Sequence, residues 1–457
     1  MNSVNQSLLP ITAKIDEAGI LHIGGCSTVD LAEKFGTPLY VYDEESIRNC
    51  CRQYKQAFAK YPKTNILFAA KAFMTSAICR IMHQEGLGLD LVSGGEIYTA
   101  VKTGFPMERT FLNGNNKSAE ELEFALKAGV GRIDVDNFSE MELLDKVAKS
   151  INMKADVLLR ITPGIECHTH DYIKTGHEDT KFGFDLSQLD EAVRLIKEKY
   201  LNINLVGLHA HIGSQIFETT GYIDLVGVLV DKLAEIREKF GITLTEMNMG
   251  GGLGIKYLES DDPPSIDELA EAVLGALDEN LKKYNYPEPI LYLEPGRSIV
   301  GTSGVTLYKA GSVKVVPEVR KYVSVDGGMA DNPRPALYGA QYSAVIANKA
   351  NQERTEKVTI SGRFCESGDI VIRDITLPEI EFGDIICVFD TGAYNYTMSF
   401  NYNRVGRPAA VLVKDGKAEI IIRRETWEDL TACDVIPESL ALPKAESKCA
   451  GCCACMG

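Results

Sequence analysis

The strongest constraint on the fold is a regular alternation of short apolar segments with longer amphipathic segments between about residues 65 and 294. The short segments have the length of buried strands, and the longer ones repeat apolar residues with the period of a helix. The expected strands are 65–70, 87–91, 109–112, 132–135, 155–161, 203–211, 244–249 and 290–294. The expected helices are 75–85, 94–103, 118–128, 139–149, 187–199, 219–240 and 265–284.

Eight strands separated by seven helices is the count of a (β/α)8 barrel. A further helix is predicted in front, from its N-cap Asp43 to about Tyr61. The spacing alone also fits an open, doubly wound sheet. Polar and glycine-rich residues follow nearly every predicted strand, however, and a barrel carries its site at these strand ends. We therefore predict an α/β fold with a TIM-like barrel over residues 37–296.

From about residue 297 the pattern changes to short β-branched runs separated by turns. This pattern predicts a C-terminal antiparallel β domain over residues 297–442. The segment 11–23 predicts a hairpin, and we assign residues 1–36 to the β domain through it. Residues 443–457 are predicted to form a disordered, cysteine-rich tail.

The formal charge of -16 argues against nucleic acid and anionic membranes as partners. No apolar run approaches the ~18 residues of a membrane span, and the start of the chain lacks the pattern of a signal peptide. We therefore expect a cytoplasmic location. Four of the 12 cysteines lie between Cys449 and Cys455. They could bind a soft metal, but we favour a flexible tail without a folded role.

Lys71 follows the first predicted barrel strand. An unpaired ammonium group is costly in an apolar interior. A lysine at this position is therefore paired, reaches outward at the strand end, or reacts as an amine of lowered pKa.

The sixth predicted strand ends with two histidines, His209 and His211. A period of two directs both into the barrel, with Val206, Leu208 and Ala210 toward the helices. The histidines could ligate a metal, or one could stack on a planar ligand. His209 could equally be a core histidine with a partner.

The last two predicted strands are followed by groups that suit an anion and a basic nitrogen. Three glycines, 250–252, follow strand seven, and consecutive N–H groups can cradle a phosphate. Glu294 and Arg297 follow strand eight. These two could pair with each other, or they could flank a bound ligand.

Together these groups fit pyridoxal 5'-phosphate. In this interpretation Lys71 attaches to the aldehyde, and His211 packs on the ring. Glu294 keeps the pyridine nitrogen protonated, so that the ring accepts electrons from a carbanion of the substrate. The phosphate end is assigned to Ser214, Gly250, Gly251, Gly252 and Arg297.

The sequence resembles the barrel-type, alanine-racemase-like pyridoxal-phosphate decarboxylases over about residues 10–435. The motifs that carry the resemblance are Phe68–Ala72, Asp90–Glu96, His211–Ser214, Gly250–Gly252, Glu294–Arg297 and Cys365–Asp369. Two further segments, 160–183 and 334–338, resemble the diaminopimelate branch of that family.

The resemblance implies a head-to-tail homodimer in which Cys365 and Glu366 of one subunit complete the site of the other. Arg297, Arg334 and Tyr338 are assigned to the distal carboxylate of the substrate, although Pro333 departs from the family pattern and bears on the pose of Arg334. The remaining positions implied at the cofactor site are Pro295, Gly296 and Tyr394, the last also near the substrate.

The implied reaction converts meso-2,6-diaminopimelate to L-lysine and CO2, the last step of lysine biosynthesis. Guanidinium groups bind carboxylates bidentately, so arginines suit the carboxylate that is kept. The carboxylate that leaves should lack a cationic partner, because an ion pair would oppose its departure. Cys365 is the candidate proton donor to the carbanion, since a thiol has a pKa of about 8.5. Glu366 would meet the ammonium at the retained end.

Several alternatives remain. Decarboxylases of ornithine or arginine act on substrates with a cationic distal end, which Arg334 would repel. Carboxynorspermidine stays open, and an alanine racemase is less favoured because the pocket suits a long dicarboxylate. Outside this class, a metal-dependent hydrolase could use His168, His170, His209 and His211. A catalytically silent relative would be expected to lack Lys71 or Cys365. The favoured interpretation needs no metal.

Overall fold

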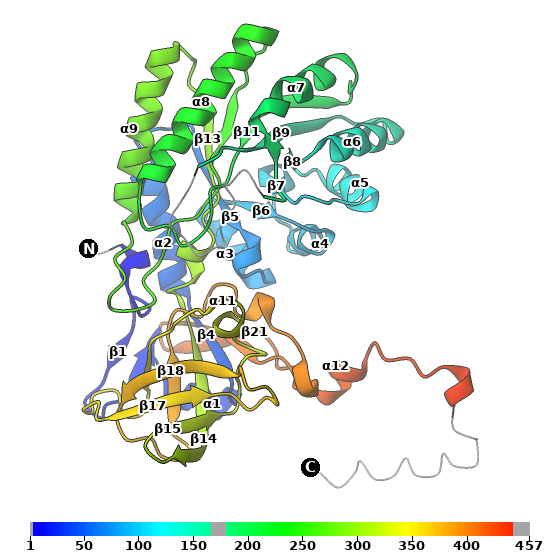
Figure 1. Ribbon diagram of the computed structural model, residues 1–457. Coiled ribbons are helices and arrows are strands. Elements are labelled where there is room, and N and C mark those ends of the chain that lie inside the picture. The colour runs from blue at the N-terminus through cyan, green and yellow to red at the C-terminus, as the bar shows by residue number, and fades with distance from the viewer. Residues whose placement is uncertain (1–2, 166–179, 442–457) are drawn as a thin grey trace.

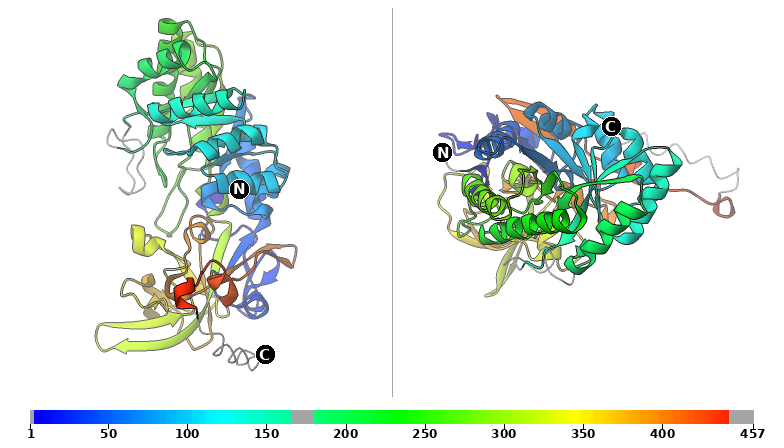
Figure 2. Two further views of the ribbon diagram at one scale, coloured as in Figure 1. Left: turned by 90° about the vertical axis from the view of Figure 1, so that its right-hand side faces the viewer. Right: turned by 90° about the horizontal axis from the view of Figure 1, so that it is seen from above.

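The computed structural model describes residues 3–165 and 180–441. It has two parts, a barrel of parallel strands surrounded by helices and a smaller β domain beneath it (Figure 1). Viewed from above, the helices surround the strands of the barrel (Figure 2). No helix in these two ranges is long and apolar enough to cross a membrane. The predicted tail and residues 166–179 lie outside the described residues.

Eight parallel strands close the barrel, which confirms the predicted fold class. Each strand pairs with the next in chain order, and β13 pairs with β5 to complete the ring. A short strand, β10 (Phe184–Asp185), adds to the end of β9. The strands of the ring are β5 (Thr64–Ala69), β6 (Gly88–Leu91), β7 (Thr110–Leu112), β8 (Arg132–Val135), β9 (Ala155–Thr162), β11 (Ile203–His209), β12 (Glu246–Asn248) and β13 (Ile290–Leu293).

The predicted barrel helices are all present, most of them within a residue or two of the expected bounds. Ser118 and Ser265 begin two of them with capping boxes, in which a serine and a glutamate each bond the other's backbone. The helices are α2 (Glu44–Ala57), α3 (Ser76–Glu85), α4 (Gly94–Lys102), α5 (Ala119–Ala128), α6 (Phe138–Ser150), α7 (Leu189–Glu198), α8 (Thr220–Phe240) and α9 (Ile266–Tyr284). Helix α2 ends before the expected Tyr61, because the chain leaves helical geometry at the buried Phe58.

The second part is a mixed sheet rather than a purely antiparallel one. Strand β4 runs parallel to β20, and β15 runs parallel to β17, whereas the other pairs are antiparallel. Its strands are β4 (Leu39–Asp43), β14 (Gly304–Val316), β15 (Arg320–Val325), β16 (Ala344–Ile346), β17 (Glu356–Ser361), β18 (Ile370–Leu377), β19 (Ile385–Val388), β20 (Ala409–Lys414) and β21 (Lys417–Ile422). Because β4 belongs to this sheet, we propose that the barrel begins at Glu44 rather than at residue 37.

The predicted N-terminal hairpin is present as β1 (Lys14–Ile15) and β2 (Leu21–Ile23), with β3 (Cys26–Ser27) beside it. It packs against the β domain instead of extending the large sheet. Leu21 and Ile23 share a core with residues of β4 and β14, and the Leu21 N–H donates to the Ala347 carbonyl at 2.8 Å. Helix α1 (Thr28–Phe35), which the sequence analysis did not predict, joins β3 to β4.

Two layers of side chains fill the barrel. The layer farther from the β domain is apolar and contains Leu67, Phe111, Leu158 and Tyr292. Val206 packs against this layer, contrary to the predicted orientation, because a bulge between Leu205 and Gly207 shifts the alternation of β11. The layer nearer the β domain, at the carboxyl ends of the strands, is polar and forms the floor of a cavity.

Candidate active site

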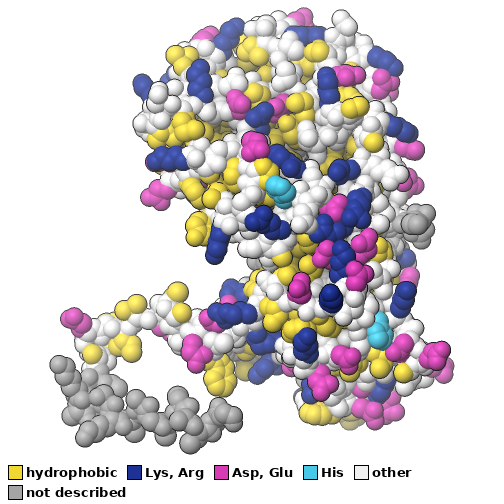
Figure 3. All heavy atoms as spheres, turned by 180° about the vertical axis from the view of Figure 1, so that it is seen from behind, with side chains coloured by type: hydrophobic (Ala, Val, Ile, Leu, Met, Phe, Trp, Pro, Cys, Tyr) yellow, Lys and Arg dark blue, Asp and Glu magenta, His cyan; other side chains and the backbone are white. Residues whose placement is uncertain are grey.

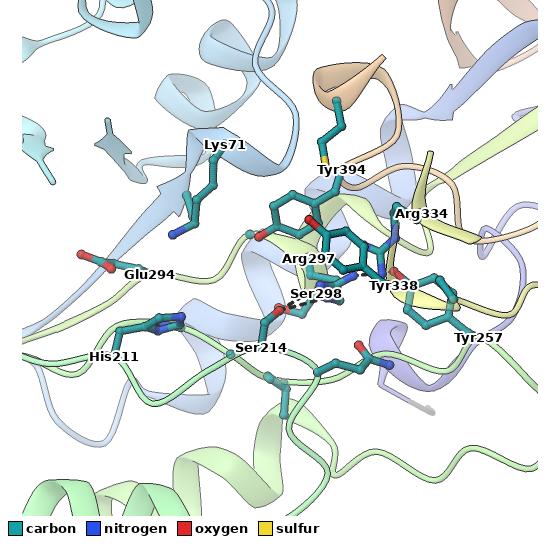
Figure 4. Close-up of a pocket in the computed structure, with 18 of the residues that line it drawn as sticks. Lys71, His211, Ser214, Tyr257, Glu294, Arg297, Ser298, Arg334, Tyr338 and Tyr394 are labelled. Carbon is teal, nitrogen blue, oxygen red and sulfur yellow. Dashed lines mark hydrogen bonds between the residues drawn. The ribbon is translucent and has the colours of Figure 1, made fainter. Parts of the chain in front are cut away.

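A cavity of about 550 Å³ lies between the carboxyl ends of the barrel strands and the β domain. Its wall combines barrel residues with residues from loops of the β domain (Figure 4). Most of the predicted site residues line it. They are Lys71, His211, Ser214, Gly251, Gly252, Glu294, Gly296, Arg297, Arg334, Tyr338 and Tyr394.

Lys71 lies in a 3-10 turn, η2 (Ala70–Ala72), directly after β5 rather than in the strand itself. The turn is held on one side by the β domain, because the Tyr394 N–H donates to the Ala72 carbonyl at 2.8 Å. The amine points into the cavity, toward the space between Glu294 and Tyr394 (Figure 4). Burial acts to lower the pKa of Lys71, but Asp90, Tyr394 and Glu294 outweigh it and raise the pKa. The Lys71 side chain is therefore directed into the cavity, where it faces a carboxylate and a tyrosine.

Glu294 is buried and accepts three hydrogen bonds. Asn248 and Asn113 donate to Oε1 at 2.7 and 3.2 Å, and Nε2 of His209 lies 3.3 Å from Oε2. Burial alone would raise the pKa of this carboxyl, but His209, Lys71 and the Asn248 amide hold the pKa well below its ordinary value. The floor of the cavity therefore presents a fixed negative charge.

His211 lies beside the cavity as a neutral imidazole. The Gly251 N–H donates to its Nδ1 at 3.3 Å, so this nitrogen is an acceptor. Burial lowers the pKa of His211, and the nearby charges of Lys71 and Arg160 lower it further. A neutral aromatic ring at this position suits packing against a flat ligand (Figure 4).

The three glycines are required by close packing as well as by the cavity. A Cβ on Gly251 would lie 2.1 Å from the Glu294 carbonyl oxygen, and one on Gly252 would lie 2.6 Å from that of Gly213. Gly250 has a φ of +66° and does not line the cavity. Its N–H donates to the Asn248 side chain at 2.9 Å. Gly251 and Gly252 therefore let the backbone itself form the cavity wall.

Two guanidinium groups stand at the other end of the cavity, each near the rings of Tyr257 and Tyr394 (Figure 4). Arg297 donates from Nη2 to the Ser214 hydroxyl at 2.9 Å and from Nη1 to the Tyr257 hydroxyl at 2.7 Å. Arg334 is 8% exposed, and its Nε has no hydrogen-bond partner within residues 3–165 and 180–441. A buried cation with unused donors is suited to bind an anion.

Arg334 begins the short helix α11 (Arg334–Tyr338), with Pro333 as its N-cap residue. Pro333 has helical backbone angles, so the departure from the family pattern is compatible with a side chain directed into the cavity.

Four predicted site residues do not line the cavity of this chain. Gly250 and Pro295 support it from behind, since the Pro295 carbonyl accepts from the Ala69 N–H at 3.1 Å. Cys365 and Glu366 are exposed on the loop between β17 and β18. Asp369 fixes this loop by accepting from the Phe364 and Met329 N–H groups at 2.8 and 2.7 Å.

Among the residues that line the cavity and that the sequence analysis missed, three contact the predicted site groups or carry a charge of their own, namely Asn113, Arg160 and Tyr257. Asn113 directly follows β7, just as Glu294 directly follows β13. The position of Asn113 at a strand end could therefore have identified it as a site residue. Arg160 belongs to a motif that carried the resemblance, but it received no role. Tyr257 lies in a loop beyond the glycines, and no pattern in the sequence distinguishes it from other surface tyrosines.

The alternative of a metal-dependent hydrolase gains little from the geometry. His168 and His170 lie outside the described residues. One nitrogen of His209 lies within 4.8 Å of carboxylate oxygens of Asp134 and Glu294, a group that does not include His211. His209 is buried beside a carboxylate partner, as expected of a core histidine.

Comparison with known proteins gives consistent matches. The family model of the pyridoxal-dependent decarboxylases, pyridoxal binding domain, matches residues 44–301. The diaminopimelate decarboxylase of Synechocystis sp. is 49% identical over 448 residues, which is 96% of this chain and 95% of that protein. The diaminopimelate decarboxylase of Bacillus subtilis is 49% identical over 427 residues, which is 93% of this chain and 97% of that protein. The crystal structure of the diaminopimelate decarboxylase from M. jannaschii in complex with L-lysine has a TM-score of 0.90 and 37% identity, covering 95% and 100% of the two chains.

Proposed function

The chain belongs to the diaminopimelate decarboxylase family of pyridoxal-dependent decarboxylases, and on this premise we propose how its own residues convert meso-2,6-diaminopimelate to L-lysine and CO2. One observation carries the proposal. A single cavity holds the Lys71 amine and the Glu294 carboxylate at one end and the guanidinium groups of Arg297 and Arg334 at the other. This arrangement suits a cofactor with a basic ring nitrogen beside a substrate with two carboxylates.

Pyridoxal phosphate supplies, when bound, an electron-accepting ring for the carbanion that remains after CO2 departs. The residues present fit this cofactor. Lys71 offers the amine for its attachment, and Glu294 offers an anion to its ring nitrogen. Gly251 and Gly252 leave room for the phosphate next to the Arg297–Ser214 pair, and the same wall includes Gly296 and Tyr394.

Arg334 orients the substrate. Its unused Nε and its place opposite Lys71 suit the distal carboxylate, which is the one that is retained. Tyr338 and Arg297 line the same end of the cavity. Because these cations hold the retained carboxylate, the other carboxylate lies at the Lys71 end, away from both guanidinium groups, and no bidentate ion pair opposes its loss as neutral CO2.

The proton that completes the product comes, in this proposal, from the partner of a homodimer. Cys365 is exposed and does not line the cavity of its own chain. A second copy that places this loop over the cavity would bring the thiol of Cys365 of the partner subunit to the carbon that lost CO2. Glu366 of the partner subunit would then meet the ammonium at the retained end.

The remaining partner is a small molecule. We propose that the enzyme acts in the cytoplasm without nucleic acid or membrane, because its net charge is -16. Acidic and basic side chains are interspersed over the face shown in Figure 3, with no continuous basic patch on that face.

The test is a visible spectrum of the purified protein before and after reduction with borohydride, followed by peptide mapping. We expect an absorption band that reduction removes, with the label on Lys71 and L-lysine as the product. Lys71→Ala should abolish both band and product, whereas Lys102→Ala, at an exposed lysine on α4, should leave both unchanged. Label on another lysine would overturn the cofactor assignment, and turnover of carboxynorspermidine in place of diaminopimelate would overturn the substrate.

A further inference from the structure

Every strand of the barrel, at its carboxyl end or just after it, contributes one polar side chain to a layer at and directly beneath the floor of the cavity, and three of these side chains are carboxyls. Asp90 is 0%, Asp134 1% and Glu294 6% exposed. Asp90 and Glu294 share the Asn113 amide as a donor, at 2.6 and 3.2 Å. The full ring, in the order of the strands, is Lys71, Asp90, Asn113, Asp134, Arg160, His209, Asn248 and Glu294.

Three buried carboxyls this close together cannot all carry a charge, because like charges in a low-dielectric interior repel strongly. The two cations of the ring, Lys71 and Arg160, do not by themselves select one carboxyl. Hydrogen-bond donors do, because each bond to an ionised carboxylate favours the charged form. The distribution of donors in the ring therefore determines which carboxyl is the anion.

The donors are distributed unequally. Glu294 has three, from Asn248, Asn113 and His209. Asp90 has only its share of the Asn113 amide, and its Oδ2 has no partner in the described residues. Neither carboxyl oxygen of Asp134 has a partner there. Accordingly, burial and Glu294 raise the pKa of Asp90 to about 8 and that of Asp134 well above its ordinary value.

His209 is the donor whose loss changes this balance most. It provides the hydrogen bond to Oε2 of Glu294, whereas both asparagines donate to Oε1. An anionic Glu294 accepts, so Nε2 of His209 carries the proton of this bond. The ring is 1% exposed, so water does not replace it as a donor.

We infer that His209 is a positioning residue for the decarboxylation. Through its bond to Oε2 it adds to the two asparagine donors that hold Glu294 ionised, and so it favours a protonated ring nitrogen in bound pyridoxal phosphate. The inference rests on the proposed function, since it needs the cofactor ring to face Glu294.

Two substitutions, His209→Gln and His209→Asn, distinguish the role of His209 as a hydrogen-bond donor from a role in packing alone. In His209→Gln the side-chain amide can reach the position of Nε2, so the donor to Glu294 is retained. In His209→Asn the amide reaches only the position of Nδ1, so the donor is lost at similar volume. Asp134→Asn replaces a neutral acid by a neutral amide and serves as a control in the same layer.

The readout is the ¹⁵N NMR signal of the ring nitrogen, after reconstitution of each holoenzyme with ¹⁵N-labelled pyridoxal phosphate. We expect a protonated nitrogen in the wild type, in His209→Gln and in Asp134→Asn. We expect a smaller protonated fraction in His209→Asn, seen as a shift of that signal, with a lower kcat and little change in KM. His209→Ser should behave as His209→Asn and replaces it if that variant does not fold.

A cofactor analogue with a CH group in place of the ring nitrogen gives a second measurement. With this analogue, His209→Asn should have the same residual kcat as the wild type, because no ring proton is left to control. A ring-nitrogen signal in His209→Asn that is unchanged from the wild type, or equal behaviour of the Asn and Gln variants, would overturn the role of His209. A wild type that binds no cofactor at Lys71 would instead overturn the proposed function.

Discussion

At the scale of single residues, Arg334 is the side chain on which we propose that recognition of the substrate depends most. It is buried in the cavity wall, and its Nε has no partner in the described residues, so a substrate carboxylate would satisfy it directly. We expect Arg334→Ala to raise KM for diaminopimelate by the equivalent of roughly 2–5 kcal/mol, because a buried charged pair loses one partner. Steady-state kinetics measure this. Arg194→Ala, at an exposed arginine on α7, is the control. An unchanged KM in Arg334→Ala would reject the carboxylate role.

The residues that the sequence predicted are those whose chemistry is conspicuous at a strand end. A lysine after an apolar strand and three glycines in a row are unusual at strand ends, and Lys71, Gly251 and Gly252 line the cavity. Asn113 and Tyr257 were missed because their side chains are ordinary in most contexts. Their importance comes from contacts with Glu294 and Arg297, which only the folded chain brings together.

At the scale of elements, we expect substitution by alanine to have opposite effects at two glycines, Gly251 after β12 and Gly275 in α9. A Cβ at Gly251 would lie 2.1 Å from the Glu294 carbonyl oxygen, so Gly251→Ala should displace the loop after β12 and reduce cofactor retention. Gly275 lies in the middle of α9 with nothing within 4 Å of a Cβ. Gly275→Ala should raise stability by roughly 1 kcal/mol, since alanine is the better helix former. Thermal unfolding and bound cofactor per chain measure both. Equal effects of the two substitutions would contradict this account.

The loop that leads into α11 should respond to pH. Asp331 is 4% exposed and accepts from the Tyr308 hydroxyl at 2.5 Å, and burial raises the pKa of Asp331 from 3.8 to about 7. The folded chain therefore holds this proton more tightly than the unfolded chain. The bound proton of Asp331 therefore stabilises the folded chain. This stabilisation is fully present below about pH 4 and is lost as the pH rises through about 7, which lowers the free energy of unfolding by up to about 4 kcal/mol.

Asp331→Asn removes that titration. As the pH rises from 5 to 8, the wild type should therefore lose stability that this variant keeps. The difference between their urea unfolding midpoints should change in favour of the variant over this range. Parallel pH profiles of the two proteins would show that Asp331 does not titrate in this range.

Elements of the barrel were predictable because each carries its own periodicity and caps. The exceptions depend on pairing rather than on local pattern. Strand β4 follows the N-terminal segment directly, yet it pairs with β14 and β20, which lie far away in the sequence. Val206 faces the interior because β11 has a bulge beside Gly207, where a Cβ would lie 2.3 Å from the Glu246 carbonyl oxygen. Neither feature is visible in the residues of the segment itself.

At the scale of the whole molecule, one chain leaves exposed both apolar side chains and two residues to which we assign a role in the reaction. Cys365 and Glu366 lie outside their own cavity. The segment after β21, which includes α12 (Trp427–Thr431), extends away from the rest of the chain (Figure 1). Trp427, Val435 and Ile436 are 75–85% exposed there. Such a surface is consistent with the proposed homodimer, since contact with a second copy would bury apolar area.

A mixing experiment tests shared sites directly. Lys71→Ala removes the amine from the barrel side of a site, and Cys365→Ala removes the thiol from the side that we assign to the partner. In a hybrid dimer of the two variants one site carries both substitutions and the other carries neither. Random exchange of subunits makes half of the dimers hybrid, so a mixture should recover about a quarter of the wild-type activity. Each variant alone should be far less active. If both functional groups of a site came from the same chain, no native site would form and mixing would restore nothing.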